Sequence, residues 1–171
     1  RLKKSAEFFG FDFNSNFEVP TKSGKKIIRL ILTKNKLRFE TKSFDNLNNN
    51  FCRFSNIILD DRNIFLRHKT NFRPWYEKTF EAIKNNEVFD EIFFNQKGEV
   101  CEGSRTNIFV EKSGQLFTPK LSCGLLDGVL RADLVKQKKV AERVLFKDDI
   151  LRADKLFLGN SVRGMIEVKF L

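Results

Sequence analysis

An amine, a carboxylate and a glycine at a helix start are the features of this sequence that could carry chemistry. Lys69 supplies the amine, Glu102 supplies the carboxylate, and Gly128-Val129-Leu130 stands where a helix is predicted to begin. Backbone N–H groups at a helix start bind phosphate, and a hydroxyl such as that of Ser161 adds to such a site. Each feature alone also has an ordinary explanation: a solvated lysine, a turn glutamate, a helix-entry glycine and a turn serine.

Composition predicts a globular protein and does not indicate a nucleic-acid partner. The chain has 171 residues, of which 41% are hydrophobic and 32% charged, with a net charge of +10. Its basic residues are spread along the chain among acids, and no aromatic-and-basic motif accompanies them, so nucleic-acid binding is not predicted. The charge remains compatible with a cleft for anionic substrates and a phosphate-bearing cofactor.

Neither a membrane span nor a metal site is expected. No apolar run approaches the roughly 20 residues that cross a bilayer, and no signal peptide is visible, so we expect a cytoplasmic protein. The cysteines Cys52, Cys101 and Cys123 show no C-x-x-C spacing, and His68 is the single histidine. We therefore expect reduced thiols and no zinc site.

Periodicity and turn residues predict mixed helices and strands, which is typical of the α+β class. Helices are expected at residues 1–9, ending at Gly10, and at 74–85, 128–138 and 146–153. Strands are expected at residues 26–33, 37–41, 52–59, 91–95, 100–101, 107–111, 115–118, 155–158 and 165–170. A polar loop is expected at residues 46–50, and the first two strands should form a hairpin that turns near residue 35.

A polar break at residues 60–63 predicts the domain boundary. We expect residues 1–62 to belong to a small domain and residues 63–171 to a larger one. The first eleven residues already read as the interior of a domain. The small domain is therefore expected to lack its natural N-terminal segment.

One long motif resembles a known signature. Glu102 is followed by Ser104, Asn107 and Ile108-Phe109, then by Thr118, and finally by Gly128-Val-Leu-Arg131 at a helix start. This order is similar to that of class-IV aminotransferases and their lyase relatives, and it is specific because it extends over some 30 residues. The resemblance implies pyridoxal 5'-phosphate as cofactor and a D-amino-acid aminotransferase-like fold. In that fold a small α/β domain precedes a larger pseudo-barrel domain.

Two further segments resemble the aminodeoxychorismate lyase branch of this family. One is His68-Lys69-Thr70 with Arg73 and Tyr76 behind it, and the other is Gly159-Asn-Ser161-Val-Arg163-Gly164. At the start of the chain, Arg1-Leu2-x-x-Ser5-Ala6 looks like the helix that supplies a phosphate-binding arginine. The resemblance therefore covers essentially the whole chain.

The resemblance implies a role for each of these residues. Lys69 would hold the cofactor as a Schiff base, with burial and nearby cations lowering its pKa, and Glu102 would accept a hydrogen bond from the pyridine nitrogen. Asn107 would brace the strand and turn. The phosphate would be bound by Gly128, Val129, Leu130, Ser161 and Arg1.

The residues that meet the substrate are less clearly marked. Transaminases of this family carry a tyrosine shortly after the lysine, but here the fifth residue on is Pro74 and Tyr76 comes two later. Arg73 and Tyr76 are candidates for the cofactor's ring oxygen and the substrate, and packing explains Tyr76 as well. Arg29 and Arg38, on the predicted hairpin, are candidates for substrate carboxylates or simply exposed strand residues.

The resemblance points first to an aminodeoxychorismate lyase, which eliminates pyruvate to form 4-aminobenzoate, a folate precursor. A branched-chain or D-amino-acid transaminase is the second hypothesis, and a non-catalytic basic binding module is the third. The family also implies a homodimer, and the lyase can be fused to, or work with, a chorismate-amination domain.

Overall fold

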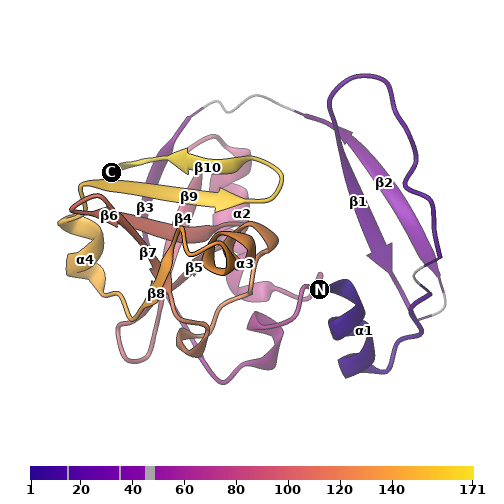
Figure 1. Cartoon of the computed structure of the whole chain (residues 1–171), viewed down its shortest axis with the longest axis horizontal. Coiled ribbons are helices and arrows are strands. Elements are labelled where there is room, and N and C mark those ends of the chain that lie inside the picture. The colour runs from indigo at the N-terminus through magenta and orange to yellow at the C-terminus, as the bar shows by residue number, and fades with distance from the viewer. Residues whose placement is uncertain (15, 35, 45–48) are drawn as a thin grey trace. The chain divides into compact units, whose positions relative to one another are not determined.

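A computed structural model describes residues 1–14, 16–34, 36–44 and 49–171 of the chain. The chain forms two compact units, Arg1–Asn46 and Leu47–Leu171 (Figure 1). The predicted hairpin turn at residue 35 and most of the predicted loop at residues 46–50 lie outside the described residues. Among the described helices, none combines the length and the apolar character that a bilayer span requires.

The first unit holds one helix and one hairpin, as predicted. Helix α1 (Leu2–Phe9) ends at Gly10, whose φ of 67° is left-handed and therefore suits glycine. Strands β1 (Lys26–Leu32) and β2 (Leu37–Ser43) pair in antiparallel fashion. The edge-to-face contact between Phe17 and Phe39, with ring centroids 5.8 Å apart, packs the connecting segment onto β2.

The second unit contains two sheets with helices and short 3-10 turns around them (Figure 1). The four-stranded sheet runs in the order β11 (Lys169–Phe170), β3 (Phe51–Leu59), β4 (Asp90–Asn95), β5 (Val100–Gly103). The five-stranded sheet runs in the order β10 (Gly164–Glu167), β9 (Lys155–Asn160), β6 (Asn107–Lys112), β7 (Gln115–Pro119), β8 (Ala141–Arg143). The helical segments are η1 (Ile64–Leu66), η2 (Pro74–Tyr76), α2 (Glu77–Lys84), η3 (Leu121–Cys123), α3 (Val129–Lys136) and α4 (Lys147–Leu151).

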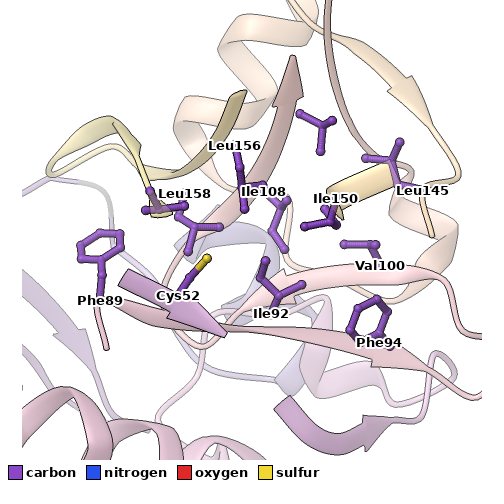
Figure 2. Close-up of a cluster of buried hydrophobic side chains, with 12 residues drawn as sticks. Cys52, Phe89, Ile92, Phe94, Val100, Ile108, Leu145, Ile150, Leu156 and Leu158 are labelled. Carbon is purple, nitrogen blue, oxygen red and sulfur yellow. The ribbon is translucent and has the colours of Figure 1, made fainter. Parts of the chain in front are cut away.

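The main core joins the two sheets. Ile92 and Phe94 of β4 belong to one buried cluster with Ile108 of β6 and with Leu156 and Leu158 of β9 (Figure 2). Side chains on alternate positions of a strand share a face, so each sheet presents one apolar face to this cluster. The sheets are thereby held together by apolar burial.

A second cluster covers the other face of β4. Phe93 lies between Ile92 and Phe94 in sequence but packs with Leu66, Tyr76 and Cys101. The centroids of the Tyr76 and Phe93 rings are 4.7 Å apart. Every residue of β4 is buried, which is the pattern of a strand covered on both faces. This cluster fixes η2 against the sheet that carries Glu102.

The observed strands differ from the predicted ones in two places. The predicted strand at 165–170 is two strands, since β10 pairs with β9 whereas β11 pairs with β3 in the other sheet. Strand β8 was not predicted, because its three residues are held by parallel pairing with β7 rather than by a local pattern. The α+β class itself is confirmed.

The division between the two units precedes β3, whereas the polar break at residues 60–63 follows it. Cys52 of β3 pairs in parallel with Asp90 of β4, and its side chain is buried in the main core. Strand β3 therefore lies with the second unit. The predicted boundary after residue 62 falls one strand further along the chain than this division.

Candidate active site

Glu102, near the end of β5, carries a buried carboxylate with three donors. Its Oε1 accepts hydrogen bonds from the hydroxyl of Tyr76 at 2.8 Å and from Nη2 of Arg73 at 3.2 Å. Its Oε2 accepts one from the backbone N–H of Leu126 at 3.1 Å. The side chains of Glu102 and Arg73 are 4% and 8% exposed, so this is a buried ion pair.

Burial dominates the electrostatics of Glu102. Loss of solvation raises the pKa of its carboxyl to about 7, since water no longer stabilises the charged form. The positive charge of Arg73, the hydrogen bonds from Tyr76 and Leu126, and the positive charge of Lys69 all act in the opposite direction on this pKa. The ionised carboxylate is therefore favoured here first by the charge of Arg73 and then by its hydrogen-bond donors.

Lys69 lies between η1 and η2, in the segment that leads to Arg73. The Lys69 residue is exposed, so the structure does not show the burial that was predicted to lower its pKa. Its charge nevertheless lowers the pKa of Glu102, which places the amine within electrostatic reach of that carboxylate. The lysine and the buried glutamate thus belong to one electrostatic environment.

The turn from Glu102 to Asn107 is built around Asp90. This fully buried carboxylate accepts hydrogen bonds from the backbone N–H groups of Glu91, Ser104 and Arg105, at 2.9–3.1 Å. The hydroxyls of Ser104 and Thr106 also donate to it, at 2.6 and 2.7 Å. Asp90 therefore fixes the residues between the end of β5 and the start of β6.

Gly103 lies at the tightest point of this turn. A Cβ atom there would lie 2.5 Å from Oδ2 of Asp90 and would also overlap the hydroxyl oxygen of Thr106. These two atoms are hydrogen-bonded to each other, so neither can move without breaking that bond. The residue after Glu102 is consequently restricted to glycine by space.

Asn107 connects β6 to the segment before α3. Its Nδ2 donates to the carbonyl oxygen of Leu126 at 2.9 Å, so the Leu126 peptide groups are held on both sides, by Asn107 and by Glu102. A Cβ atom on Gly128 would overlap Oδ1 of Asn107. Asn107 therefore braces the approach to α3 at two points.

Helix α3 begins directly after this brace. Its N-cap is Gly128, with extended backbone angles and no side-chain cap, and the first helical hydrogen bond joins the N–H of Ala132 to the carbonyl of Gly128. The N–H groups of Val129 and Leu130 precede that bond, so the helix itself offers them no acceptor. They are donors at the positive end of the helix.

The turn between β9 and β10 lies against the first turn of α3. A Cβ atom on Gly159 would lie 3.2 Å from a methyl carbon of Leu130, so these two residues are in close contact. Two residues after Gly159, Ser161 is exposed, and its turn is closed by Oδ1 of Asn160, which accepts from the N–H groups of Val162 and Arg163. Ser161 therefore lies in a turn packed against the start of α3.

Three predicted site residues lie in the first unit. Arg1 precedes α1 and accepts, through its carbonyl, the N–H of Ser5 at 3.1 Å. Arg29 and Arg38 both pair with Glu40, at 3.9 and 3.3 Å, and their side chains are 63% and 64% exposed. Roles in phosphate or substrate binding stay predictions for all three arginines.

The structure brings together most of the residues that the sequence marked in the second unit, and it adds two. Arg73 and Tyr76 were predicted near the ring oxygen or the substrate, and here both contact Glu102. Asp90 and Leu126 were not predicted as part of the site. The acids Asp90 and Glu91 inside the apolar run at residues 88–94 were a signal for a buried carboxylate, but not for which of the two binds the turn. Leu126 contributes through its backbone N–H and carbonyl, so the type of its side chain gave no signal.

Comparison with known proteins identifies the family. The model of the family Amino-transferase class IV matches residues 1–170, and the chain belongs to this family. A protein from Thermotoga maritima named a probable branched-chain-amino-acid aminotransferase is 29% identical, over all of this chain and 69% of its own length.

Two solved structures of similar proteins carry different names. One, from Mesorhizobium loti and provisionally named an amino-acid aminotransferase, matches with a TM-score of 0.88 and 31% identity over 100% of this chain and 88% of its own. Another, from Legionella pneumophila and provisionally named a 4-amino-4-deoxychorismate lyase, has a TM-score of 0.69 and 28% identity. It covers 79% of this chain and 53% of its own. The family and the fold are thus shown, and both reactions occur among the names of similar proteins.

Pyridoxal 5'-phosphate is the cofactor of this family, and the residues present fit it. The buried carboxylate can pair with the ring nitrogen of the cofactor, and the amine within electrostatic reach of it can react with the aldehyde. The N–H groups at the start of α3, which have no acceptor within the helix, can bind the phosphate. No group of three metal-ligating side chains occurs in the part of the chain that the structure describes.

Proposed function

We propose that this chain catalyses the elimination of pyruvate from 4-amino-4-deoxychorismate to give 4-aminobenzoate. The observation that carries the proposal is the buried carboxylate of Glu102, whose pKa Lys69 lowers, next to the braced start of α3. Bound pyridoxal phosphate supplies an electron-withdrawing ring that stabilises negative charge on the substrate carbon. The roles of the chain's own residues follow from their positions.

Lys69 is the proposed covalent attachment point and general base. Its amine takes the proton from the substrate carbon that bears the nitrogen. The electron pair of that C–H bond forms the new ring double bond as the C–O bond on the neighbouring carbon breaks. The enolpyruvate oxygen leaves with its electron pair and receives a proton, which Lys69 returns in this proposal, so that pyruvate and an aromatic amine result.

Glu102 is the proposed partner of the cofactor's ring nitrogen. An ionised carboxylate at that point favours the protonated ring, and the burial that raises the pKa of Glu102 also strengthens the attraction to a cation. The N–H groups of Val129 and Leu130, after Gly128, are the proposed phosphate donors, together with the hydroxyl of Ser161. A phosphate-binding role for Arg1 is a separate part of the proposal, supported by the resemblance of its helix to that of the family. Asn107 is the proposed brace of this phosphate site.

The choice of lyase over transaminase is supported by two segments. His68-Lys69-Thr70 and the turn from Gly159 to Gly164 resemble the lyase branch, and one similar solved structure carries that name. The runner-up is a branched-chain or D-amino-acid transaminase, which the Thermotoga maritima relative favours. A homodimer, and cooperation with a chorismate-amination domain, are further parts of the proposal and are tested by light scattering and by co-purification.

The test uses the purified full-length protein. Loading with pyridoxal phosphate should give a visible absorbance band that Lys69→Ala abolishes and Lys78→Ala, at an exposed position of α2, retains. Added 4-amino-4-deoxychorismate should then yield fluorescent 4-aminobenzoate. Turnover seen only with an amino donor and a keto acid would reject the lyase in favour of the transaminase. Absence of the band in the unaltered protein would favour a non-catalytic binding module.

A further inference from the structure

The contacts of Glu102 are unequally divided between its two oxygens. Oε1 accepts both the hydroxyl of Tyr76 and Nη2 of Arg73, whereas Oε2 accepts the N–H of Leu126. Within the described residues Oε1 has two donors and Oε2 has one, so Oε2 is the less occupied oxygen and has room for a further donor. Oε1 is thus the oxygen that binds the side chains of the protein.

Both donors to Oε1 come from the segment that follows Lys69. Arg73 is four residues after the lysine and Tyr76 seven, and Tyr76 is itself locked against Phe93 in the second apolar cluster. Arg73 lies over the Tyr76 ring, 4.6 Å from its centroid, and its Nη1 donates to the carbonyl of Ser104 at 3.0 Å. The lysine segment is therefore tied to the Glu102 turn at three buried bonds.

From this geometry we propose that Arg73 and Tyr76 are positioning residues for the cofactor-ring carboxylate. They occupy Oε1 of Glu102, so that Oε2 is presented to the ring nitrogen, and the charge of Arg73 and the hydrogen bond from Tyr76 favour the ionised carboxylate over its protonated form. The inference rests on the proposed function, because it assumes that Glu102 faces the ring. It gives both residues a role on the ring-nitrogen side, in place of the ring-oxygen or substrate role predicted from sequence.

The charged and titratable groups around Glu102 support a role for Arg73 in stabilising its carboxylate. Its surroundings hold the cations Arg73 and Lys69, the phenol of Tyr76 and, on its own strand, the thiol of Cys101. Burial raises the pKa of both Tyr76 and Cys101, so these two groups remain neutral at physiological pH. Arg73 is the buried cation of this set and Lys69 is exposed, which makes Arg73 the main source of compensating charge.

The experiment measures protonation of Glu102 directly. Infrared difference spectra of the full-length protein, freed of cofactor, should show a protonated-carboxyl stretch that titrates near pH 7 and disappears in Glu102→Gln. Arg73→Gln should move the midpoint upward by about one unit or more, a tenfold or greater gain in proton affinity. Tyr76→Phe, which keeps the ring and loses one hydrogen bond, should move it upward by about half a unit.

Two control variants separate charge from folding. Arg73→Lys retains the cation and should restore much of the midpoint. Arg53→Gln removes an arginine from another buried glutamate, Glu91, to which its Nε donates at 2.8 Å, and should leave the Glu102 midpoint in place. If Arg73→Gln fails to fold, the Glu102 midpoint measured in Tyr76→Phe still tests the positioning role. Unmoved midpoints in folded Arg73→Gln and Tyr76→Phe would overturn the proposal.

The loaded full-length protein distinguishes failure of this inference from failure of the proposed function. Its visible spectrum should change with pH at a higher midpoint in Arg73→Gln than in the unaltered protein. A visible band that Lys69→Ala abolishes, together with unmoved midpoints, would refute the positioning role alone. If the unaltered protein shows no band, the cofactor role of the site fails first, and the assignment of Oε2 to a ring nitrogen fails with it.

Discussion

Asp90 and Glu102 are two buried carboxylates of the same region, one at the start of β4 and one where the turn between β5 and β6 begins, and they differ in how many donors they have. Asp90 accepts five hydrogen bonds, all from neutral backbone and hydroxyl groups. Glu102 accepts three, and one of these comes from a cation. A carboxylate saturated by neutral donors anchors the chain, whereas one with capacity left can respond to a ligand and to pH.

Matched amide variants test this difference most strongly. Asp90→Asn replaces one acceptor oxygen with an NH2 group that faces the N–H and hydroxyl donors of the turn. Some of these buried donors then lose their acceptor, so the free energy of unfolding should fall by about 3 to 4 kcal/mol. Glu102→Gln resembles the protonated form, which a pKa of about 7 already half populates at neutral pH, so its cost should be about 1 kcal/mol. Urea unfolding of the cofactor-free protein measures both, and equal costs would contradict the comparison.

A methyl group at Gly103 tests whether the Asp90 network is rigid. Gly103→Ala should cost about 2 to 3 kcal/mol, because the new carbon overlaps a hydrogen-bonded pair that has no room to move. Gly114→Asn is the matched control, since Gly114 has a φ of 76° and open space around it. Asparagine tolerates that conformation, so its effect should stay within about 0.5 kcal/mol. A mild Gly103→Ala effect would mean that the turn adapts.

The pH dependence of stability sharpens the view of Glu102. Its pKa of about 7 in the folded state exceeds the value of 4.5 expected without burial, so the folded protein binds this proton more tightly than the unfolded chain. This contribution is fully present below pH 4.5 and is lost as the pH rises through 7, by about 3 kcal/mol in the cofactor-free protein. Thermal unfolding across this range should show a fall that Glu102→Gln reduces. An unchanged slope in that variant would assign the fall to another group.

Much of the local structure and the motif could be predicted from the sequence, because each depends on nearby residues. The end of α1 at Gly10 follows from glycine's access to left-handed angles. The strands on either side of the Glu102 turn follow from short apolar segments bounded by turn residues, and the site residues Glu102, Asn107 and Gly128 follow from the spacing of the family motif. The resemblance then gave the family, which the comparisons confirm.

The parts that escaped prediction depend on pairing between distant residues. The run from residue 165 to 170 changes sheets where the N–H of Val168 bonds to the carbonyl of Leu156, and no local pattern marks that change. The two side-chain donors to Glu102 stand 26 and 29 residues before it, so their shared acceptor became visible only in the fold. Local sequence also cannot decide that Asp90, rather than its neighbour Glu91, collects the donors of the turn.

The overlap between Gly128 and Asn107 has a consequence for how this chain can be altered. The space for a side chain at position 128 is filled by the amide oxygen of residue 107, and that amide also holds Leu126. Substitutions at these two positions should therefore be epistatic: alanine at 128 becomes tolerable only when 107 is shortened, and shortening 107 releases Leu126. A library randomised at both codons and selected for folding should return glycine with asparagine far more often than independent choice would give.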